Sequence, residues 1–207
     1  MKIKEHWLRG PGIVRQQTNK HSGPLDGPQL IVLHYTAGAN ALSSVEHLTH
    51  PQVQASAHLV IGREGTVWQL LPFHLAAWHA GLSHYQGRRG VNRFSIGIEL
   101  DNAGKLKRRD NRFFTAFGQE VPPEEVYAHK QAGILTYWHR YTAIQAKRLE
   151  GIANLLLETY PSLSEVVGHS HITARKQDPG PALGCWATRG REFHLELPET
   201  SKQQDYL

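Results

Sequence analysis

The sequence is poor in sulfur: its 207 residues include one cysteine and one methionine. The single cysteine, Cys185, excludes a disulfide framework and any metal site built from several thiolates. Strictly apolar runs reach only about four residues, as at 30–33, whereas a bilayer-spanning helix needs about 20. Residues 1–12 hold no apolar core and no small-residue cleavage site, so we expect no signal peptide and a cytoplasmic protein.

Several familiar motifs are also missing, namely HExxH, GxSxG, the phosphate-binding P-loop and GxGxxG. The net charge of +5 favours polyanions in general. Its one basic run, at 105–109, has no interleaved aromatic residues and is expected to be a solvated loop. We therefore expect no nucleic-acid partner, no membrane partner and a monomer.

What is present is typical of an α/β fold in one domain spanning residues 1–207. Residues 30–35 are apolar on both faces of an expected strand, which predicts a central strand covered on both sides. The sequence further predicts a hairpin turning at 63–65, a strand at 95–100 and a short strand at 165–168. A long helix starts at a capping box of Thr142 and Gln145 and stops at Pro161.

Other segments are harder to interpret. Residues 1–28 are expected to form a surface arm, and a short helix is expected at 43–49, capped by Ser43 with Glu46. Residues 103–141 mix charge, glycine and aromatics without a clear period, which suggests an insertion that carries some helix but makes no domain. Cys185 is expected to be a buried, inert thiol in a C-terminal helix.

Titratable residues gather near the C-terminus, where His169, Lys176 and Asp178 lie within ten residues of one another. Pro179 holds Asp178 in extended backbone. A histidine and a carboxylate on a rigid loop suit Zn²⁺, with a third ligand from elsewhere, and His34 at the end of a strand is the best-placed donor. The alternative is that these residues only hydrogen-bond the loop backbone.

A second feature is the strand face that carries Ser95, Gly97 and Glu99. The small neighbours leave room above the sheet beside the carboxylate, which suits a pocket. An exposed sheet face with an ordinary salt bridge is the alternative.

Five strings occur in the order LHYTAG, SAHLVIGREGTVWQL, AWHAGLSHYQGR, SIGIELDN and VVGHSHITARKQDPGP. Together they resemble the zinc-dependent N-acetylmuramoyl-L-alanine amidases of type 2, particularly the AmpD-like subgroup. The resemblance implies a mixed sheet flanked by helices, as in peptidoglycan-recognition folds. It also implies one Zn²⁺ per chain, held by His34, His169 and Asp178.

The implied reaction is hydrolysis of the amide between the lactyl group of N-acetylmuramic acid, or its anhydro form, and L-alanine of the stem peptide. The implied partner is a muropeptide or peptidoglycan. Glu99 is then the general base, and Lys176 stabilises the oxyanion. His58 is expected to donate a hydrogen bond near the metal. Four residues are expected to contact substrate: Tyr35, Arg63, Trp78 and His79.

The substrate-binding assignments have structural alternatives, because the loop at 78–79 or an exposed turn arginine explains them as well. The sequence also departs from the family pattern. Asp178 follows His169 by nine positions rather than ten, and His171 replaces an acid and becomes a rival ligand. The insertion at 103–141 is longer than in compact members. A non-catalytic muropeptide-binding module remains an alternative function, and a role in recycling, lysis or intoxication stays open.

Overall fold

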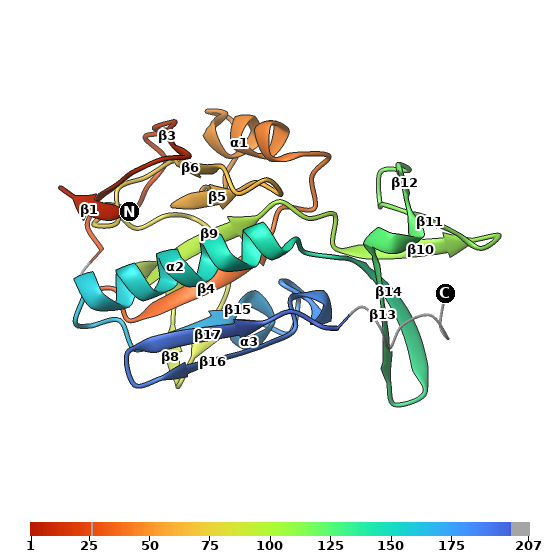
Figure 1. Ribbon diagram of the computed structural model, residues 1–207. Coiled ribbons are helices and arrows are strands. Elements are labelled where there is room, and N and C mark those ends of the chain that lie inside the picture. Colours follow the sequence, from red (N-terminus) through yellow and green to blue (C-terminus); the bar gives the residue numbers. More distant parts are fainter. Residues whose placement is uncertain (26, 200–207) are drawn as a thin grey trace.

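A computed structural model describes residues 1–25 and 27–199. Its centre is a six-stranded sheet (Figure 1). From edge to edge the strands are β15 (Glu165–Gly168), β4 (Leu30–Tyr35), β9 (Ser95–Leu100), β5 (Leu59–Ile61), β6 (Val67–Gln69) and β3 (Ile13–Arg15). The first four run parallel, β6 is antiparallel to β5, and β3 is parallel to β6. The expected α/β fold with a mixed sheet is confirmed.

Strand β4 is buried on both faces, as its sequence predicts. Ile31 and Leu33 pack in the main core with helix α2 (Ala143–Thr159), whereas Leu30 and Val32 pack in a second cluster on the opposite face. Thr142 and Gln145 form the predicted capping box at the start of α2. One helix therefore covers one face of the sheet and leaves the other face for the site.

That other face carries α1 (Ala41–Thr49) and the single-turn helix α3 (His169–Ile172). Helix α1 begins two residues before the expected start, because Asn40 is its N-cap and Ser43 completes the capping box. The predicted pairing of Ser43 with Glu46 is therefore wrong. Asparagine caps a helix as well as serine does, and it lies earlier in the chain.

The two chain ends differ from expectation. Strands β1 (Lys2–Lys4) and β2 (Trp7–Arg9) form a hairpin with Trp7 and Leu8 buried, and β3 extends the central sheet, so residues 1–28 are more than a surface arm. Cys185 is exposed and starts the hairpin of β16 (Cys185–Arg189) and β17 (Glu192–Glu196). The predicted C-terminal helix and buried thiol are wrong, because alternate residues of β16 and β17 turn toward the core.

Residues 73–94, between the hairpin and β9, contain little regular structure. They include a small hairpin of β7 (His84–Tyr85) and β8 (Arg88–Arg89) and a 3-10 helix at Val91–Phe94. Within the described ranges, no helix combines the length and hydrophobicity that crossing a membrane requires.

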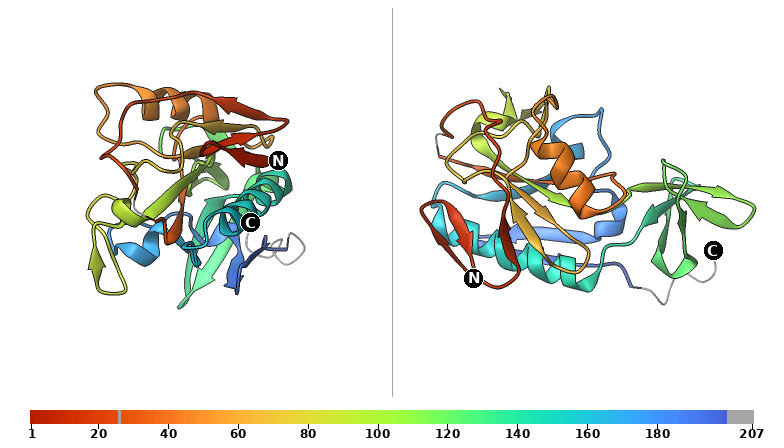
Figure 2. Two further views of the ribbon diagram at one scale, coloured as in Figure 1. Left: turned by 90° about the vertical axis from the view of Figure 1, so that its left-hand side faces the viewer. Right: turned by 90° about the horizontal axis from the view of Figure 1, so that it is seen from above.

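The insertion is an antiparallel five-stranded sheet that projects from the body (Figures 1 and 2). Its order is β12 (Glu120–Val121), β11 (Arg112–Phe114), β10 (Lys105–Arg109), β14 (Ile134–His139) and β13 (Val126–Gln131). A 3-10 turn at Pro123–Glu125 is its only helical segment among the residues described, so the expected helix is wrong. The basic run lies on β10 rather than in a loop, although its charged side chains are exposed. Leu106, Phe113 and Tyr137 share a face and form a separate small core.

Candidate metal centre

Three buried ligand atoms converge where β4 and β15 end. His34 is the fifth residue of β4, His169 follows β15 directly, and Asp178 lies in the next loop. Because β4 and β15 are parallel neighbours, their carboxyl ends meet at one edge of the sheet. His34 Nδ1 lies 2.9 Å from His169 Nδ1 and 3.0 Å from Asp178 Oδ2, and the last two atoms are 2.9 Å apart.

The donor set fits zinc. Two imidazoles and one carboxylate form a common catalytic zinc set, which leaves a fourth position for water or substrate. Ligand atoms around a tetrahedral zinc lie about 3.3 Å apart when the bonds are about 2.0 Å, so little adjustment of this triangle is needed. Burial alone raises the pKa of Asp178, but the two adjacent imidazoles of His169 and His34 outweigh it and hold that pKa well below its usual value. The carboxylate is therefore charged, as a ligand must be.

A chain of hydrogen bonds behind His34 presents the correct nitrogen to a metal. The hydroxyl of Ser95 donates to the carbonyl of Val91 at 2.7 Å, so it accepts from His79 Nε2 at 3.1 Å. His79 Nδ1 then accepts from His34 Nε2 at 3.0 Å, which leaves His34 Nδ1 with its lone pair free. Burial lowers the pKa of both His34 and His79, which favours the neutral rings that this chain requires.

The room predicted above Gly97 exists, and the imidazole of His79 fills it. A Cβ at Gly97 would collide with that ring, so only glycine fits here. His58 does not bond a ligand residue: its Nδ1 accepts from the Gly97 amide at 3.0 Å and its Nε2 donates to Leu75 O at 2.8 Å. His58 thus holds the strand on which His79 rests.

Glu99 sits opposite His34 across the β4–β9 pair. Its Oε2 is buried without a hydrogen-bond partner, and within the described residues Glu99 forms no ion pair, which contradicts the exposed salt-bridge alternative. Burial raises the pKa of Glu99 well above its usual value; Asp178 adds to this and Lys176 opposes it. An orphaned carboxylate oxygen beside three converging ligand atoms fits a site where a metal and a water molecule belong.

A cleft of about 800 Å³ opens over these groups, within the size range of small-molecule sites. Tyr35, Trp78, His79, Glu99 and Lys176 line it together with the three candidate ligands. Arg63 does not reach this cleft. It pairs instead with Glu125 of the insertion at 2.7 Å.

The rival ligand His171 points elsewhere. It lies on the turn of α3 rather than in extended chain, so it does not face the same way as His169. It is exposed, and its Nδ1 accepts from the Gly168 amide at 2.9 Å.

Sequence reasoning missed three residues that support the site. Ser95 ends the hydrogen-bond chain described above. Tyr141 donates to Pro179 O at 2.7 Å, and the ring of Trp138 lies 2.7 Å from where a Cβ of Gly180 would be. The contacts of Tyr141 and Trp138 brace the loop that carries Asp178. No local pattern marks them, because their partners lie about 40 residues away along the chain.

Comparisons with known proteins identify the family. Residues 24–181 match the family described as N-acetylmuramoyl-L-alanine amidase. The 1,6-anhydro-N-acetylmuramyl-L-alanine amidase AmpD of Citrobacter freundii is 33% identical, over 87% of this chain and 78% of that protein. Among relatives named AmpD, the match spans from 54% to 94% of the relative's own length.

Two solved structures share the fold. A crystal structure of a selenomethionine AmpD derivative has a TM-score of 0.63 and 28% identity, covering 87% of this chain and 93% of that one. The amidase AmiD of Escherichia coli, in complex with anhydro-N-acetylmuramic acid-L-Ala-D-γ-Glu-L-Lys, has a TM-score of 0.56 and 29% identity. This match covers 79% of this chain and 56% of the AmiD chain. Together with the family match, these likenesses show that the chain belongs to the N-acetylmuramoyl-L-alanine amidase family.

Proposed function

We propose that this chain is a zinc-dependent hydrolase of the amide bond between the lactyl group of N-acetylmuramic acid, or its anhydro form, and L-alanine of the stem peptide. One observation carries the proposal: the buried, unpartnered Glu99 oxygen lies beside the converging ligand atoms of His34, His169 and Asp178 in one cleft. A module that only binds muropeptide needs no such carboxylate.

The roles follow from position. His34, His169 and Asp178 would hold the zinc, which would supply Lewis acidity and lower the pKa of water toward neutrality. Glu99 takes the proton of the attacking water and delivers it to the leaving amine of L-alanine. Lys176, on the wall of the cleft, stabilises the negative charge that develops on the carbonyl oxygen.

The names and bound ligand of similar proteins support the proposed muropeptide substrate. AmiD binds an anhydro-muropeptide in its solved complex, and the relatives named AmpD carry the anhydro substrate in their names. We infer that a muropeptide lies in the 800 Å³ cleft with its lactyl amide over the ligand triangle. Tyr35, Trp78 and His79 border that cleft and are proposed to contact the muropeptide, whereas Arg63 lies outside the cleft.

The test is hydrolysis of a defined muropeptide. Zinc-loaded protein is incubated with anhydro-N-acetylmuramyl tripeptide, and mass spectrometry follows release of a peptide with a free L-alanine amine. Glu99→Gln is expected to keep one zinc per chain and lose about 10²-fold or more in turnover, the scale of general-base catalysis.

The matched control is Glu158→Gln on the exposed side of α2, which should cleave like the wild type. Binding without cleavage by zinc-loaded wild type would favour the non-catalytic module. Wild-type turnover by Glu99→Gln would remove Glu99 from the reaction.

A further inference from the structure

A second cleft of about 180 Å³ lies where the insertion meets the body. Gly38 lines both this cleft and the catalytic one, so the two adjoin. The loop at Ala39 forms one wall, and the turn at 115–119 between β11 and β12 forms another. Of the residues that the sequence predicts to contact substrate, Arg63 lines this second cleft, whereas Tyr35, Trp78 and His79 line the catalytic one. The catalytic cleft therefore continues into a second cleft that is not needed to bind the groups on either side of the cleaved amide.

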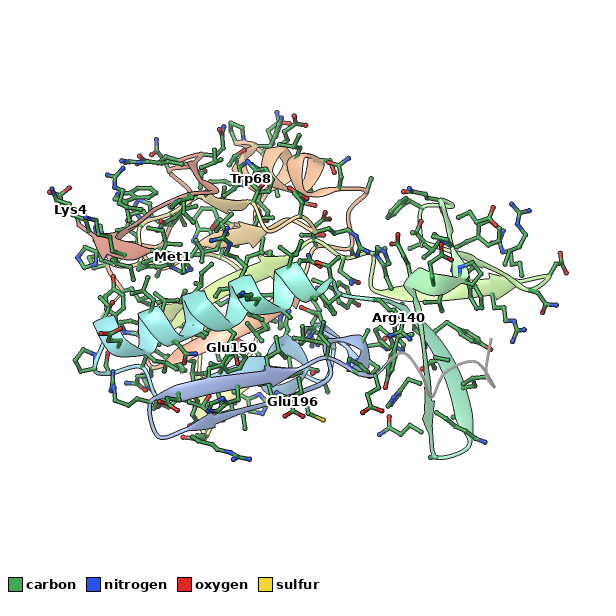
Figure 3. All side chains as sticks on the ribbon, viewed as in Figure 1. Met1, Lys4, Trp68, Arg140, Glu150 and Glu196 are labelled. Atoms are coloured by element: carbon green, nitrogen blue, oxygen red, sulfur yellow. The ribbon has the colours of Figure 1, made fainter. Side chains whose placement is uncertain are left out.

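The floor of this second cleft is rigid. Arg63, from the β5–β6 turn, donates to Glu125 at 2.7 Å and to the carbonyl of Arg140 at 2.9 Å. His139 lies 2.9 Å from the same Glu125 carboxylate, and its Nδ1 accepts from the Ala103 amide at 3.1 Å. Arg140 marks this junction at the root of the projection (Figure 3). These bonds fix the insertion to the body, so the cleft is preformed.

Two of the three carboxylates that line the second cleft are paired with arginine. Glu125 pairs with Arg63, and Glu120 pairs with Arg112, which does not line the cleft. The third, Asp101, is only 6% exposed. Little accessible charge is therefore offered to an ammonium or a carboxylate of a stem peptide. The paired groups keep spare lone pairs, which suit a neutral ligand rich in hydroxyl groups.

The rim carries an aromatic face. Phe117 is 46% exposed and lines the cleft, although large apolar side chains are usually turned inward. Its turn is held by bonds between Thr115 and Gln119, including Gln119 N to Thr115 Oγ1 at 3.0 Å. An exposed ring on a fixed turn, beside the Gln119 amide, offers a flat apolar surface and a hydrogen-bonding group. This is the combination that a sugar ring needs, with C–H groups on its faces and hydroxyls on its edge.

We propose that the second cleft binds one further sugar ring of the glycan, next to the muramic acid ring in the catalytic cleft. Its 180 Å³ is below the range that encloses a drug-sized ligand, about 300 Å³ or more, and suits a single ring. The enzyme then prefers muropeptides that carry two or more sugars. This inference rests on the proposed amidase function and specifies its substrate.

The test compares two substrates with the same stem peptide, one with anhydro-muramic acid alone and one with an N-acetylglucosamine attached. Wild type is expected to have a higher kcat/KM for the two-sugar substrate. Phe117→Ala should reduce that preference by roughly 3- to 10-fold, the scale of one aromatic contact, through KM rather than kcat. Phe117→Trp should retain it. Ile134→Ala, an exposed apolar residue of the insertion outside the cleft, is the matched control and should change nothing.

Equal kcat/KM for the two substrates in wild type, or the same loss on both in Phe117→Ala, would overturn the sugar site while leaving the amidase function intact. Cleavage of neither substrate would instead remove the amidase function. Binding then decides the sugar site by itself: saturation-transfer NMR with the peptide-free disaccharide and metal-free protein should show contact in wild type and weaker contact in Phe117→Ala. Absence of contact in wild type overturns the proposal.

Discussion

The candidate metal centre at the edge of the central sheet and the insertion differ in how far their charged and polar groups are buried. At the edge, His34 and Asp178 are buried, one oxygen of Glu99 is buried without a partner, and the three candidate ligand atoms lie within 3.0 Å of one another. The insertion at 103–141 contains seven Lys and Arg residues and four Asp and Glu residues. Most of these are exposed, around a small core. The edge tolerates little change because each group depends on another. Exposed groups of this kind suit specificity rather than chemistry.

The two regions meet on both sides of the candidate ligands. The ring of Tyr35, next to His34, lies 2.7 Å from where a Cβ of Gly104 would be, at the start of the insertion. At its other end, Trp138 and Tyr141 contact the loop after Asp178. The root of the insertion therefore belongs to the site, although its tip does not.

Removing a ligand at the edge should have the largest effect. Asp178→Ala leaves two ligand atoms, so we expect loss of bound zinc and a fall in activity on the order of 10³-fold or more, beyond the 10- to 100-fold that outer partners cost. Glu124→Ala, an exposed acid of the insertion, should keep both. Zinc is measured by plasma emission and folding by circular dichroism. Full zinc content in Asp178→Ala would break the contrast between the regions.

The second-largest effect is expected from mutations in the hydrogen-bond chain behind His34. His79→Ala is expected to weaken zinc affinity by roughly 10- to 100-fold, because nothing then orients His34 Nε2. Ser95→Ala should cost less, since His79 stays in place. His129→Ala removes a half-buried imidazole from the insertion and should leave affinity unchanged. Chelator competition gives the affinities, and ¹⁵N shifts of the His34 ring report its tautomer; an unaltered tautomer in His79→Ala would refute the positioning role.

The same contrast explains what the sequence predicts and what it does not. Strands β4 and β9 and helix α2 are predictable because burial on both faces and a capping box are local signals. The ligand positions became specific only through the family resemblance, since spacing alone left a backbone-bonding loop open. The family resemblance implies that His79 contacts substrate, and His79 does line the cleft, but its hydrogen bonds to His34 and Ser95 add a positioning role that no local pattern predicts.

The sequence predicts the insertion but not its sheet, because the strands are short and several pair with strands that are distant along the chain. Two signals were nevertheless present. Two-residue loops join β10 to β11 at Asp110 and Asn111, and β13 to β14 at Ala132 and Gly133, all with positive φ. Tight hairpins favour this conformation, and Asp-Asn between segments with aromatic residues is a recognisable turn.

Buried histidine also makes the edge sensitive to acid. Burial lowers the pKa of His58 to about 4, below its ordinary 6.5. Between these values the unfolded chain binds more protons than the folded one, so stability is complete above pH 6.5 and falls as the pH drops toward 4. At pH 5 the expected loss from His58 is about 2 kcal/mol relative to pH 7.

The measurement is urea unfolding of metal-free protein at pH 7 and pH 5. His58→Gln, which keeps a donor for Leu75 O, should lose less stability between the two pH values than wild type. His129→Ala in the insertion should retain the wild-type difference. An equal pH effect in wild type and His58→Gln would show that His58 is not the source.

The smallest effect concerns the root of the insertion and tests where the boundary between the regions lies. Tyr141→Phe removes the bond to Pro179 O and leaves a buried carbonyl without that partner, at a cost of about 1 to 3 kcal/mol in unfolding free energy. Because Pro179 follows Asp178, zinc affinity should also fall, by a few-fold. Tyr137→Phe removes a hydroxyl that faces Arg108 inside the insertion, so it should leave zinc affinity unchanged. If both variants bind zinc like wild type, the root braces the fold but not the ligand, and the functional boundary lies at Pro179 rather than within the insertion.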